Sequence, residues 1–127
     1  MKNLELALRY MEIFFSGGDP DAMADIFAEN LVFEGPFKRF DNSADYIASL
    51  KADPPIGCEY KLIRAFEAGD SVNLVYDFIR GEIRTPMLQL FELKGGKIVR
   101  ILLVFDTSGF VLAGGEGEAD NGLYLKA

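Results

Sequence analysis

The stretch Gly95-Gly96-Lys97-Ile98-Val99-Arg100-Ile101-Leu102-Leu103-Val104-Phe105-Asp106 decides how the rest of the chain is interpreted. Two glycines form a turn, an almost wholly apolar run rich in β-branched residues follows, and a carboxylate ends it. A run of this length and composition, flanked by glycine, is typical of a β-strand that is buried on both faces. The sequence therefore predicts that this stretch is the centre of a sheet, with Asp106 at its mouth.

Length and composition indicate one globular domain. The chain has 127 residues, of which 50% are hydrophobic, and this is too apolar for a disordered protein. A net charge of −7 without a basic cluster argues against nucleic-acid partners, which bind through phosphate neutralisation, and against anionic membrane surfaces. Because Glu5, Arg9 and Glu12 interrupt the N-terminal apolar stretch, we expect neither a signal peptide nor a membrane span.

The chain contains no histidine, and Cys58 is its only cysteine. The lack of histidine excludes Ser-His-Asp and Cys-His catalysis, an imidazole base and the usual zinc sites. Acid-base chemistry therefore falls to Asp, Glu, Tyr, Lys or Cys58. We expect no metal and no cofactor, and a single cysteine fits a cytoplasmic location.

The first half of the chain predicts three helices and one short strand. A helical spacing of apolar residues predicts the first helix over residues 2–15, with a stripe made of Leu4, Leu8, Met11 and Phe15. An aspartate cap followed by proline predicts a second, short helix over residues 20–29. A strand over 31–34 and a third helix over 43–50 follow, and the next proline pair ends that helix.

From residue 57 onward, turns about ten residues apart predict an antiparallel meander of long strands. These strands cover residues 58–68, 71–80 and 83–93, and the opening stretch is the fourth. Alternation places two sets on common faces: Cys58, Tyr60, Leu62 and Phe66 on the first strand, and Thr85, Met87, Gln89, Phe91 and Leu93 on the third. Pro86 predicts a bulge or an unpaired edge stretch.

We expect one domain over residues 1–110, followed by an acidic, glycine-rich tail over residues 111–127. Within the tail, Leu123-Tyr124-Leu125 could dock back onto the domain as a short strand.

This order of elements resembles the nuclear transport factor 2-like superfamily, which includes SnoaL-like and ketosteroid-isomerase-like proteins. The resemblance covers about residues 4–110 and is carried by Gly18-Asp19, by Leu31-Val32-Phe33-Glu34-Gly35-Pro36 and by the Gly96-Lys97-Ile98 turn. It implies a cone-shaped α+β barrel, with three N-terminal helices packed in a curved, mainly antiparallel sheet. It also implies an apolar pocket inside the cone and a homodimer formed through the outer sheet surface.

The chain departs from the isomerase-like members at their catalytic positions. Their general-base Asp matches Gly35 here, with Glu34 adjacent, and their oxyanion-stabilising acid matches Gln89. Their oxyanion Tyr matches Met11, and Tyr10 is about 100° away around the helix. These departures predict that steroid isomerisation is not the activity, although an amide can still donate a hydrogen bond to a developing oxyanion.

Asp106 and Gln89 are the candidate catalytic residues. A carboxylate at the end of a buried strand can be desolvated, which raises its pKa and suits it to acid-base work. The alternative is that Asp106 caps the turn Asp106-Thr107-Ser108-Gly109 through its side chain. Gln89 shares a face with Met87 and Phe91, where it either binds a ligand carbonyl or makes a structural hydrogen bond.

The candidate ligand-binding residues are Tyr60, Tyr76, Met87, Phe91, Glu34 and Asp77. Alternation along the strand places Asp77 with Asn73 and Val75 on the solvent or interface side, which is the alternative to a place in the cavity. Glu34 either reaches the pocket rim or is exposed, and the aromatic residues are either core or pocket wall.

Three hypotheses follow. The first is a cofactor-free enzyme that acts on a small hydrophobic carbonyl compound by proton transfer, with Asp106 as the acid-base group and Gln89 as the carbonyl donor. The second is a non-catalytic module that binds the same kind of ligand. The third is an interaction domain that uses the outer sheet face and the acidic tail, and a cone filled by Phe and Tyr that leaves no cavity would favour it over the other two.

Overall fold

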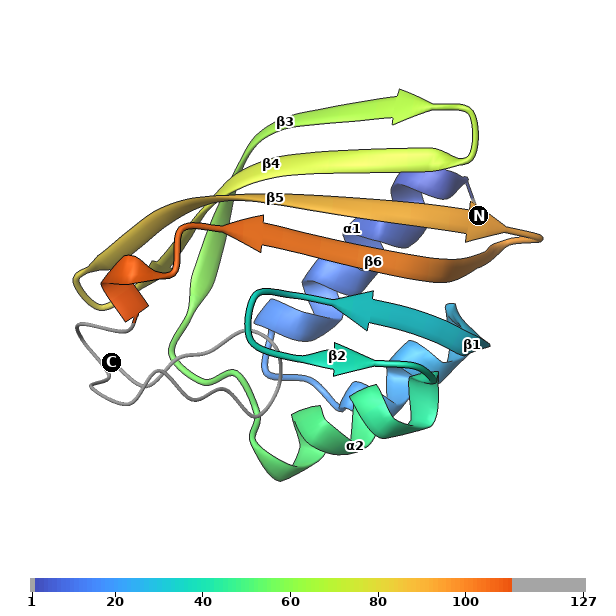
Figure 1. Ribbon diagram of the computed structural model, residues 1–127, viewed down its shortest axis with the longest axis horizontal. Helices are drawn as coiled ribbons and strands as arrows, with labels where there is room; N and C mark the ends of the chain where they lie inside the picture. The colour runs from blue at the N-terminus through green and yellow to red at the C-terminus, as the bar shows by residue number, and fades with distance from the viewer. Residues whose placement is uncertain (1, 111–127) are drawn as a thin grey trace.

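Six strands form one curved sheet in the order β2-β1-β6-β5-β4-β3 in a computed structural model, which describes residues 2–110 (Figure 1). The elements in chain order are α1 (Asn3–Phe15), the 3-10 helix η1 (Pro20–Asp25), β1 (Phe27–Glu34), β2 (Arg39–Phe40), α2 (Ser43–Ala52), β3 (Glu59–Ala68), β4 (Ser71–Arg80), β5 (Ile83–Lys94) and β6 (Lys97–Phe105). The predicted tail over residues 111–127, with its possible strand at Leu123–Leu125, lies outside the described residues.

β6 lies in the middle of the sheet, as the opening stretch predicted. It pairs antiparallel with β5 and parallel with β1, so the last strand joins the meander to the first half of the chain. The prediction that it is buried on both faces was wrong. Ile98, Ile101 and Leu103 are buried on the inner face, whereas Val104 on the outer face is 52% exposed. Within the described residues of one chain, no element covers this outer face.

The helices cover the inner face, where Figure 1 places α1 behind β4, β5 and β6. The buried stripe of α1 differs from the predicted one. Leu4, Leu8 and Phe15 are only partly buried, and the buried residues are Leu6, Ala7, Tyr10, Met11, Ile13 and Phe14. The helix is rotated toward this second set because its two aromatic residues, Tyr10 and Phe14, bury the larger apolar area.

The second predicted helix is shorter than expected. Asp19 caps it, as predicted, by accepting a hydrogen bond from the backbone N–H of Asp21 at 2.9 Å. It continues only as η1, and β1 begins at Phe27 rather than at Leu31. The backbone N–H of Ile98 donates to the Ile26 carbonyl at 2.8 Å, so pairing with β6 competes with the helix and prevails from this point.

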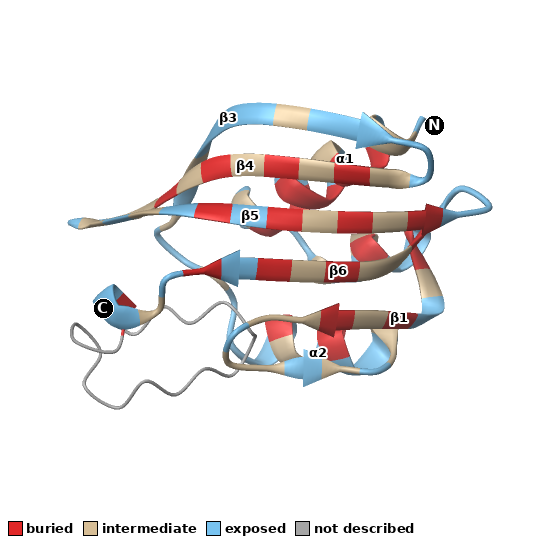
Figure 2. Ribbon diagram, turned by 45° about the horizontal axis from the view of Figure 1, so that its top comes forward, coloured by how far each residue is buried: buried red, intermediate tan, exposed pale blue. Residues whose placement is uncertain are grey.

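The meander follows the predicted turns, and Figure 2 shows the alternation of buried and partly exposed residues along β4 and β5. On β5, Met87, Gln89, Phe91 and Leu93 are all buried on one face, as predicted. Pro86 pairs with Asp77 of β4 but lies beyond the last residue of β6 that pairs with β5. The unpaired edge stretch predicted for Pro86 is therefore confirmed, because its missing N–H faces no partner strand there.

One face assignment on β3 was wrong. Tyr60 and Leu62 face inward, opposite Phe78 and Tyr76, but the register shifts between Leu62 and Arg64. This β-bulge inserts one residue, so every later side chain changes face. Phe66 is consequently on the outer face, where it is 54% exposed.

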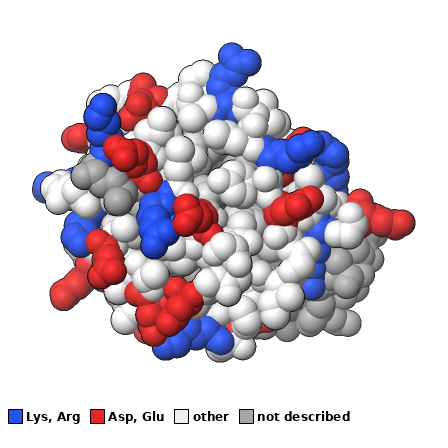
Figure 3. All heavy atoms as spheres, turned by 180° about the vertical axis from the view of Figure 1, so that it is seen from behind, with Lys and Arg blue, Asp and Glu red and all other residues white. Residues whose placement is uncertain are grey.

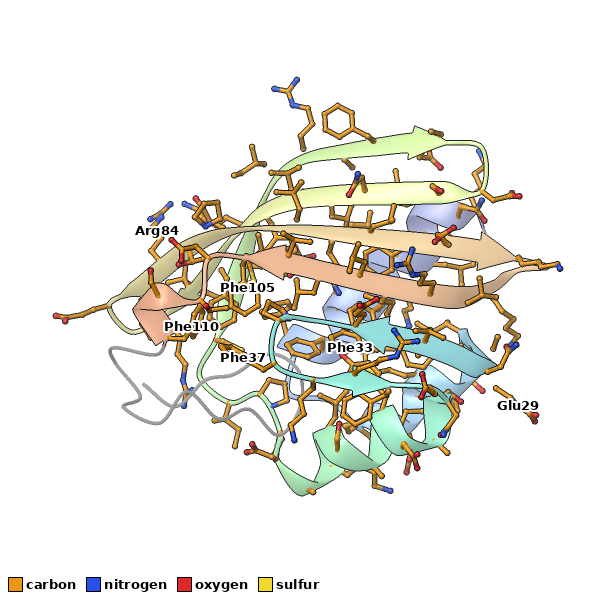
Figure 4. All side chains as sticks on the ribbon, viewed as in Figure 1. Glu29, Phe33, Phe37, Arg84, Phe105 and Phe110 are labelled. Carbon is orange, nitrogen blue, oxygen red and sulfur yellow. The ribbon has the colours of Figure 1, made fainter. Side chains whose placement is uncertain are left out.

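Aromatic rings close the end of the interior near the last residue of β6. Figure 4 shows Phe37, Phe105 and Phe110 close together there. The ring centroids of Phe37 and Phe105 are 5.9 Å apart, those of Phe105 and Phe110 are 5.0 Å apart, and Phe110 also contacts Phe78 at 5.8 Å. None of the helices within residues 2–110 is both long and apolar enough to cross a membrane.

Candidate functional site

Gln89 is the one buried side chain within residues 2–110 that is polar and not aromatic, with 2% of its surface exposed. β5 places it on the inner face between Leu74 of β4 and Leu103 of β6. The hydroxyl of Tyr76 donates to Gln89 Oε1 at 2.7 Å. An unpaired amide in such surroundings would cost free energy, and this bond satisfies its carbonyl oxygen.

Two further tyrosines complete the polar group. The hydroxyls of Tyr10 on α1 and Tyr46 on α2 are 2.5 Å apart and hydrogen-bond each other. Each tyrosine is at most 2% exposed. We call Tyr10, Tyr46, Tyr76 and Gln89 the Tyr/Gln cluster, which joins two helices and two strands at the centre of the domain.

The Tyr/Gln cluster has more hydrogens available to donate than hydrogen bonds that use them. Its three hydroxyls and one primary amide carry five hydrogens that can be donated. Hydrogen bonds within the cluster use at most three of these hydrogens, so at least two lack an acceptor among the described residues. Because buried donors are normally paired, this deficit marks the place where a ligand acceptor could bind.

Burial also sets the charge of the Tyr/Gln cluster. It raises the pKa values of Tyr10, Tyr46 and Tyr76 well above the usual tyrosine value, because it penalises the phenolate form. The phenols are therefore neutral hydrogen-bond donors at physiological pH. No carboxylate is buried within residues 2–110, so the interior of the described region has no charged base.

Apolar side chains close the space around the Tyr/Gln cluster. Phe14, Phe15, Phe33 and Leu103 line it together with the polar groups, and it is too narrow to hold a water molecule. Phe33 stacks on Tyr46 with ring centroids 4.3 Å apart. This part of the cone is therefore filled by aromatic rings, not open as an apolar cavity.

A larger hollow of about 330 Å³ lies next to this space, at the end of α1. We call it the α1 groove, and its lining residues are Ile13, Phe14, Phe15, Ser16, Gly17, Gly18, Pro20, Met23, Leu50, Pro54, Pro55, Ile56, Gly57 and Cys58. None of these residues is charged. Figure 3, which views the molecule from the α1 side of the sheet, likewise shows uncharged surface between separate groups of charged side chains. The groove and the narrow space around the Tyr/Gln cluster share Phe14 and Phe15.

Comparison with known proteins identifies the family. The model of the SnoaL-like domain matches residues 7–101. The chain belongs to the SnoaL-like domain family. No curated protein is significantly similar to this SnoaL-like domain in sequence.

Solved structures share the fold of the SnoaL-like domain at low sequence identity. An NTF2-like protein of unknown function from Cytophaga hutchinsonii is 23% identical, with 87% of this chain and 95% of that chain covered and a TM-score of 0.74. An LEH-like epoxide hydrolase from M. tuberculosis is 21% identical, with 83% of each chain covered and a TM-score of 0.69. An NTF-2 like protein of unknown function from Burkholderia xenovorans is 17% identical, with 87% and 90% covered and a TM-score of 0.70.

Four of the residues singled out in the sequence lie at or beside the Tyr/Gln cluster. Tyr76 and Gln89 belong to it, and Met87 and Phe91 are fully buried on the same face of β5. The ring of Phe91 also packs edge-on against Tyr10 at 5.5 Å. Tyr60 is half-buried at the β3 edge, where its ring centroid is 5.7 Å from that of Tyr76.

The three carboxylates from the sequence analysis lie away from the Tyr/Gln cluster. Glu34 is on the outer face, 3.6 Å from Arg100, and Asp77 is on the outer face, 3.1 Å from Arg84. Asp106 is exposed beyond β6, where its Oδ1 accepts the backbone N–H of Ser108 at 3.0 Å. That bond lowers the pKa of the Asp106 carboxyl, and the contact is the turn cap that was the alternative interpretation.

Sequence reasoning missed Tyr10 and Tyr46 as members of the site. Tyr10 was set aside because Met11 matches the family position, but α1 buries both residues. The spacing of Leu6, Tyr10 and Phe14 at every fourth residue is a signal that could have placed Tyr10 on the buried face. No local pattern shows that Tyr46, 36 residues away, meets it. Within residues 2–110, no group of three or more potential metal ligands lies together.

Proposed function

We propose that the SnoaL-like domain binds a small, uncharged, mostly apolar molecule that carries a carbonyl group. The observation that carries this proposal is the pair of unused donor hydrogens in the Tyr/Gln cluster. A carbonyl oxygen has two lone pairs and accepts two hydrogen bonds, which matches the deficit. The apolar surroundings exclude competing water and strengthen such bonds.

The same surroundings select against ions. None of the described residues that line the α1 groove is charged, and the only buried polar group within residues 2–110 that is not aromatic is the neutral Gln89. An ionised ligand would lose its hydration there without gaining a counter-charge, and this costs several kcal/mol. A volume of about 330 Å³ is at the lower end of the range for small-molecule sites, so the groove suits the apolar body of a compact ligand.

The first prediction compares three probes of one shape. We expect 2-acetylnaphthalene, a neutral ketone, to bind about tenfold more tightly than 2-ethylnaphthalene, which lacks the carbonyl. The carboxylate 2-naphthoate should bind most weakly of the three, because it is charged. Isothermal titration of the full chain measures the three affinities.

The control for this prediction is Gln89→Leu, a variant of similar side-chain volume that lacks the amide. It should remove most of the preference for the ketone and leave the affinity for 2-ethylnaphthalene within about twofold of wild type. Equal affinities of the wild-type domain for ketone and hydrocarbon would contradict the proposal. Circular dichroism at the titration temperature checks that both proteins are folded.

Binding, rather than acid-base turnover, is the function that the residues favour. The candidate acid Asp106 is exposed, and its lowered pKa makes it a weak base at neutral pH. The buried tyrosines donate hydrogen bonds but do not ionise in the neutral range. A catalytic role for Asp106 stays a prediction.

We also propose that the domain forms a homodimer through the outer face of the sheet. Val75, Leu88 and Val104 lie side by side across β4, β5 and β6, and Leu88 and Val104 are 47% and 52% exposed. Charges of both signs flank this apolar row, among them the Arg100–Glu92 pair at 3.0 Å. A two-fold axis brings the same patch of two copies together, and mixed charges at its margin are compatible with that symmetry.

The second prediction tests the dimer. Leu88→Glu should raise the dimer dissociation constant by at least about 100-fold, because each copy would bury an unpaired carboxylate in an apolar contact. Analytical ultracentrifugation over a range of concentrations measures the constant. The matched control is Ile56→Glu, which adds the same charge at a residue that is 69% exposed and away from the sheet. A wild-type protein that stays monomeric at 100 times the working concentration would contradict the proposal.

A further inference from the structure

Phe15 lies between the α1 groove and the Tyr/Gln cluster. Its ring lines both the groove and the narrow space beside Gln89, and it is the last residue of α1. Phe15 is therefore, with Phe14, one of the two rings shared by the groove and the space around the buried donors. The two unused hydrogens of the Tyr/Gln cluster cannot be reached while the ring is in place, since the space behind it is too narrow for water.

Ring packing holds Phe15, and its side chain makes no hydrogen bond or ion pair within residues 2–110. Its ring packs against Phe14 and Tyr60 at 4.9 Å, against Phe78 at 6.1 Å and against the ring of Tyr76 at 6.3 Å. It is half-buried, whereas Phe14 is 4% exposed. α1 ends directly after it, and Gly17 then adopts a φ of 74°, so no further helical turn packs over the ring.

Phe14 also lines both the groove and the narrow space, but it is more deeply buried than Phe15. Its ring centroid is 6.0 Å from that of Tyr10, and it belongs to the buried stripe of α1. Moving it would open a cavity in the core, and such cavities cost several kcal/mol. Moving Phe15 exposes a ring that already faces solvent in part, which costs much less.

We infer that Phe15 is a specificity-determining residue that separates the groove from the Tyr/Gln cluster and yields only to ligands whose carbonyl reaches that cluster. This inference rests on the proposed function. A molecule without an acceptor stays in the groove, because it gains nothing from displacing the ring. A ketone gains two hydrogen bonds when it displaces the ring, and these offset the contacts that Phe15 loses.

The need to displace the Phe15 ring reduces the apparent affinity of the wild-type domain for the ketone. The conformation that admits the ligand is a minor one, so the measured dissociation constant is the intrinsic one divided by the fraction that is open. Association is slower for the same reason, since binding requires a side-chain rearrangement. Removing the ring should therefore increase both the affinity and the association rate for the ketone, and leave the hydrocarbon nearly unchanged.

The test uses Phe15→Ala and Phe15→Leu in the full chain, with 2-acetylnaphthalene and 2-ethylnaphthalene as probes. We expect Phe15→Ala to increase the affinity for the ketone about tenfold and to raise its association rate by a similar factor in stopped-flow fluorescence. The affinity for the hydrocarbon should change by less than about threefold. Phe15→Leu keeps an apolar side chain at the helix end, so it should lose less stability than Phe15→Ala. Its gain in affinity for the ketone should be intermediate.

The matched control is Ile13→Ala, which enlarges the α1 groove from the same helix but does not line the space beside Gln89. It should alter the affinities for both probes equally. The double variant Phe15→Ala/Gln89→Leu should lose the gain for the ketone. The carbonyl ¹³C chemical shift of bound ketone reports whether its oxygen receives hydrogen bonds.

The outcomes separate this inference from the proposed function. If the wild-type domain prefers the ketone, but both Phe15 variants leave its affinity and association rate within twofold of wild type, the role of Phe15 is overturned and the proposed function stands. If neither wild type nor variants distinguish ketone from hydrocarbon, both are overturned. A gain in Phe15→Ala that disappears with Gln89→Leu supports both.

Discussion

Raising the pH above 10 is expected to unfold the SnoaL-like domain cooperatively, with a loss of about 4 kcal/mol of stability for each further pH unit. The cause is the burial of Tyr10, Tyr46 and Tyr76, whose pKa values lie above the ordinary value of 10.0. Each phenol that is protonated in the folded state and ionised in the unfolded state contributes about 1.4 kcal/mol per pH unit.

The sign follows from proton binding. A raised pKa means that the folded state keeps its protons at a pH where the unfolded state has released them. The stabilisation is thus complete below pH 10, the value for an unfolded tyrosine, and is lost as the pH rises toward the folded values. The Cys58 thiol, whose pKa burial raises to about 11, acts in the same direction.

Absorbance at 295 nm, recorded together with circular dichroism, measures this transition. The chain has five tyrosines, and we expect three of them to ionise only as the secondary structure is lost. Tyr46→Phe should reduce the pH slope by about one third, because one buried phenol is gone. Tyr60→Phe, at the half-buried edge, is the matched control and should change the slope much less. Reversible ionisation of all five tyrosines near pH 10 in the folded protein would contradict the prediction.

Gln89→Glu is expected to destabilise the domain by about 4 kcal/mol at pH 7 and by little at pH 4. The new side chain has nearly the same shape, so packing is conserved while a carboxyl replaces the amide. Gln89 is 2% exposed, and buried glutamates reach pKa values of about 8–9. The folded state then holds a proton that the unfolded state releases above about pH 4.3, so stability is present below that pH and is lost as the pH rises.

Urea denaturation at pH 4, 5, 6 and 7 measures this pH dependence relative to wild type. The control is Asn73→Asp, which makes the same amide-to-carboxyl change on the outer face of β4, where Asn73 is only half-buried. The loss of stability in Asn73→Asp should stay below about 1 kcal/mol and vary weakly with pH. A Gln89→Glu variant that is equally stable at pH 4 and pH 7 would show that water or a cation reaches this position.

Much of the architecture could be predicted because it follows from local rules. The glycine turns, the alternation along β4 and β5 and the apolar run of β6 each depend on a few neighbouring residues. The errors arise where tertiary contacts override such rules. η1 is cut short because Ile26 accepts a bond from β6, and Phe66 changes face because of one bulge residue in β3. The periodicity of the sequence indicates neither the early end of η1 nor the bulge in β3.

The site was only partly predictable for the same reason. Gln89 was found because a lone amide on an apolar face is unusual in any strand. Tyr10 and Tyr46 lie on different helices, and only the packing of those helices brings their hydroxyls together. The carboxylates are conspicuous in the sequence, yet Glu34, Asp77 and Asp106 are all held by contacts outside the interior.

The pairing of β1 with β6 has a consequence for how the chain is made. Within residues 2–110, β1 pairs only with β6 and with the two-residue strand β2, and Lys97 Nζ donates to the Asp25 carbonyl across 72 residues of sequence. On the ribosome, the helices and the first strand emerge long before the strand that they join, while β3, β4 and β5 can already pair as hairpins. The closing of that long loop comes last and carries the largest entropic cost, so it is the step expected to limit the folding rate.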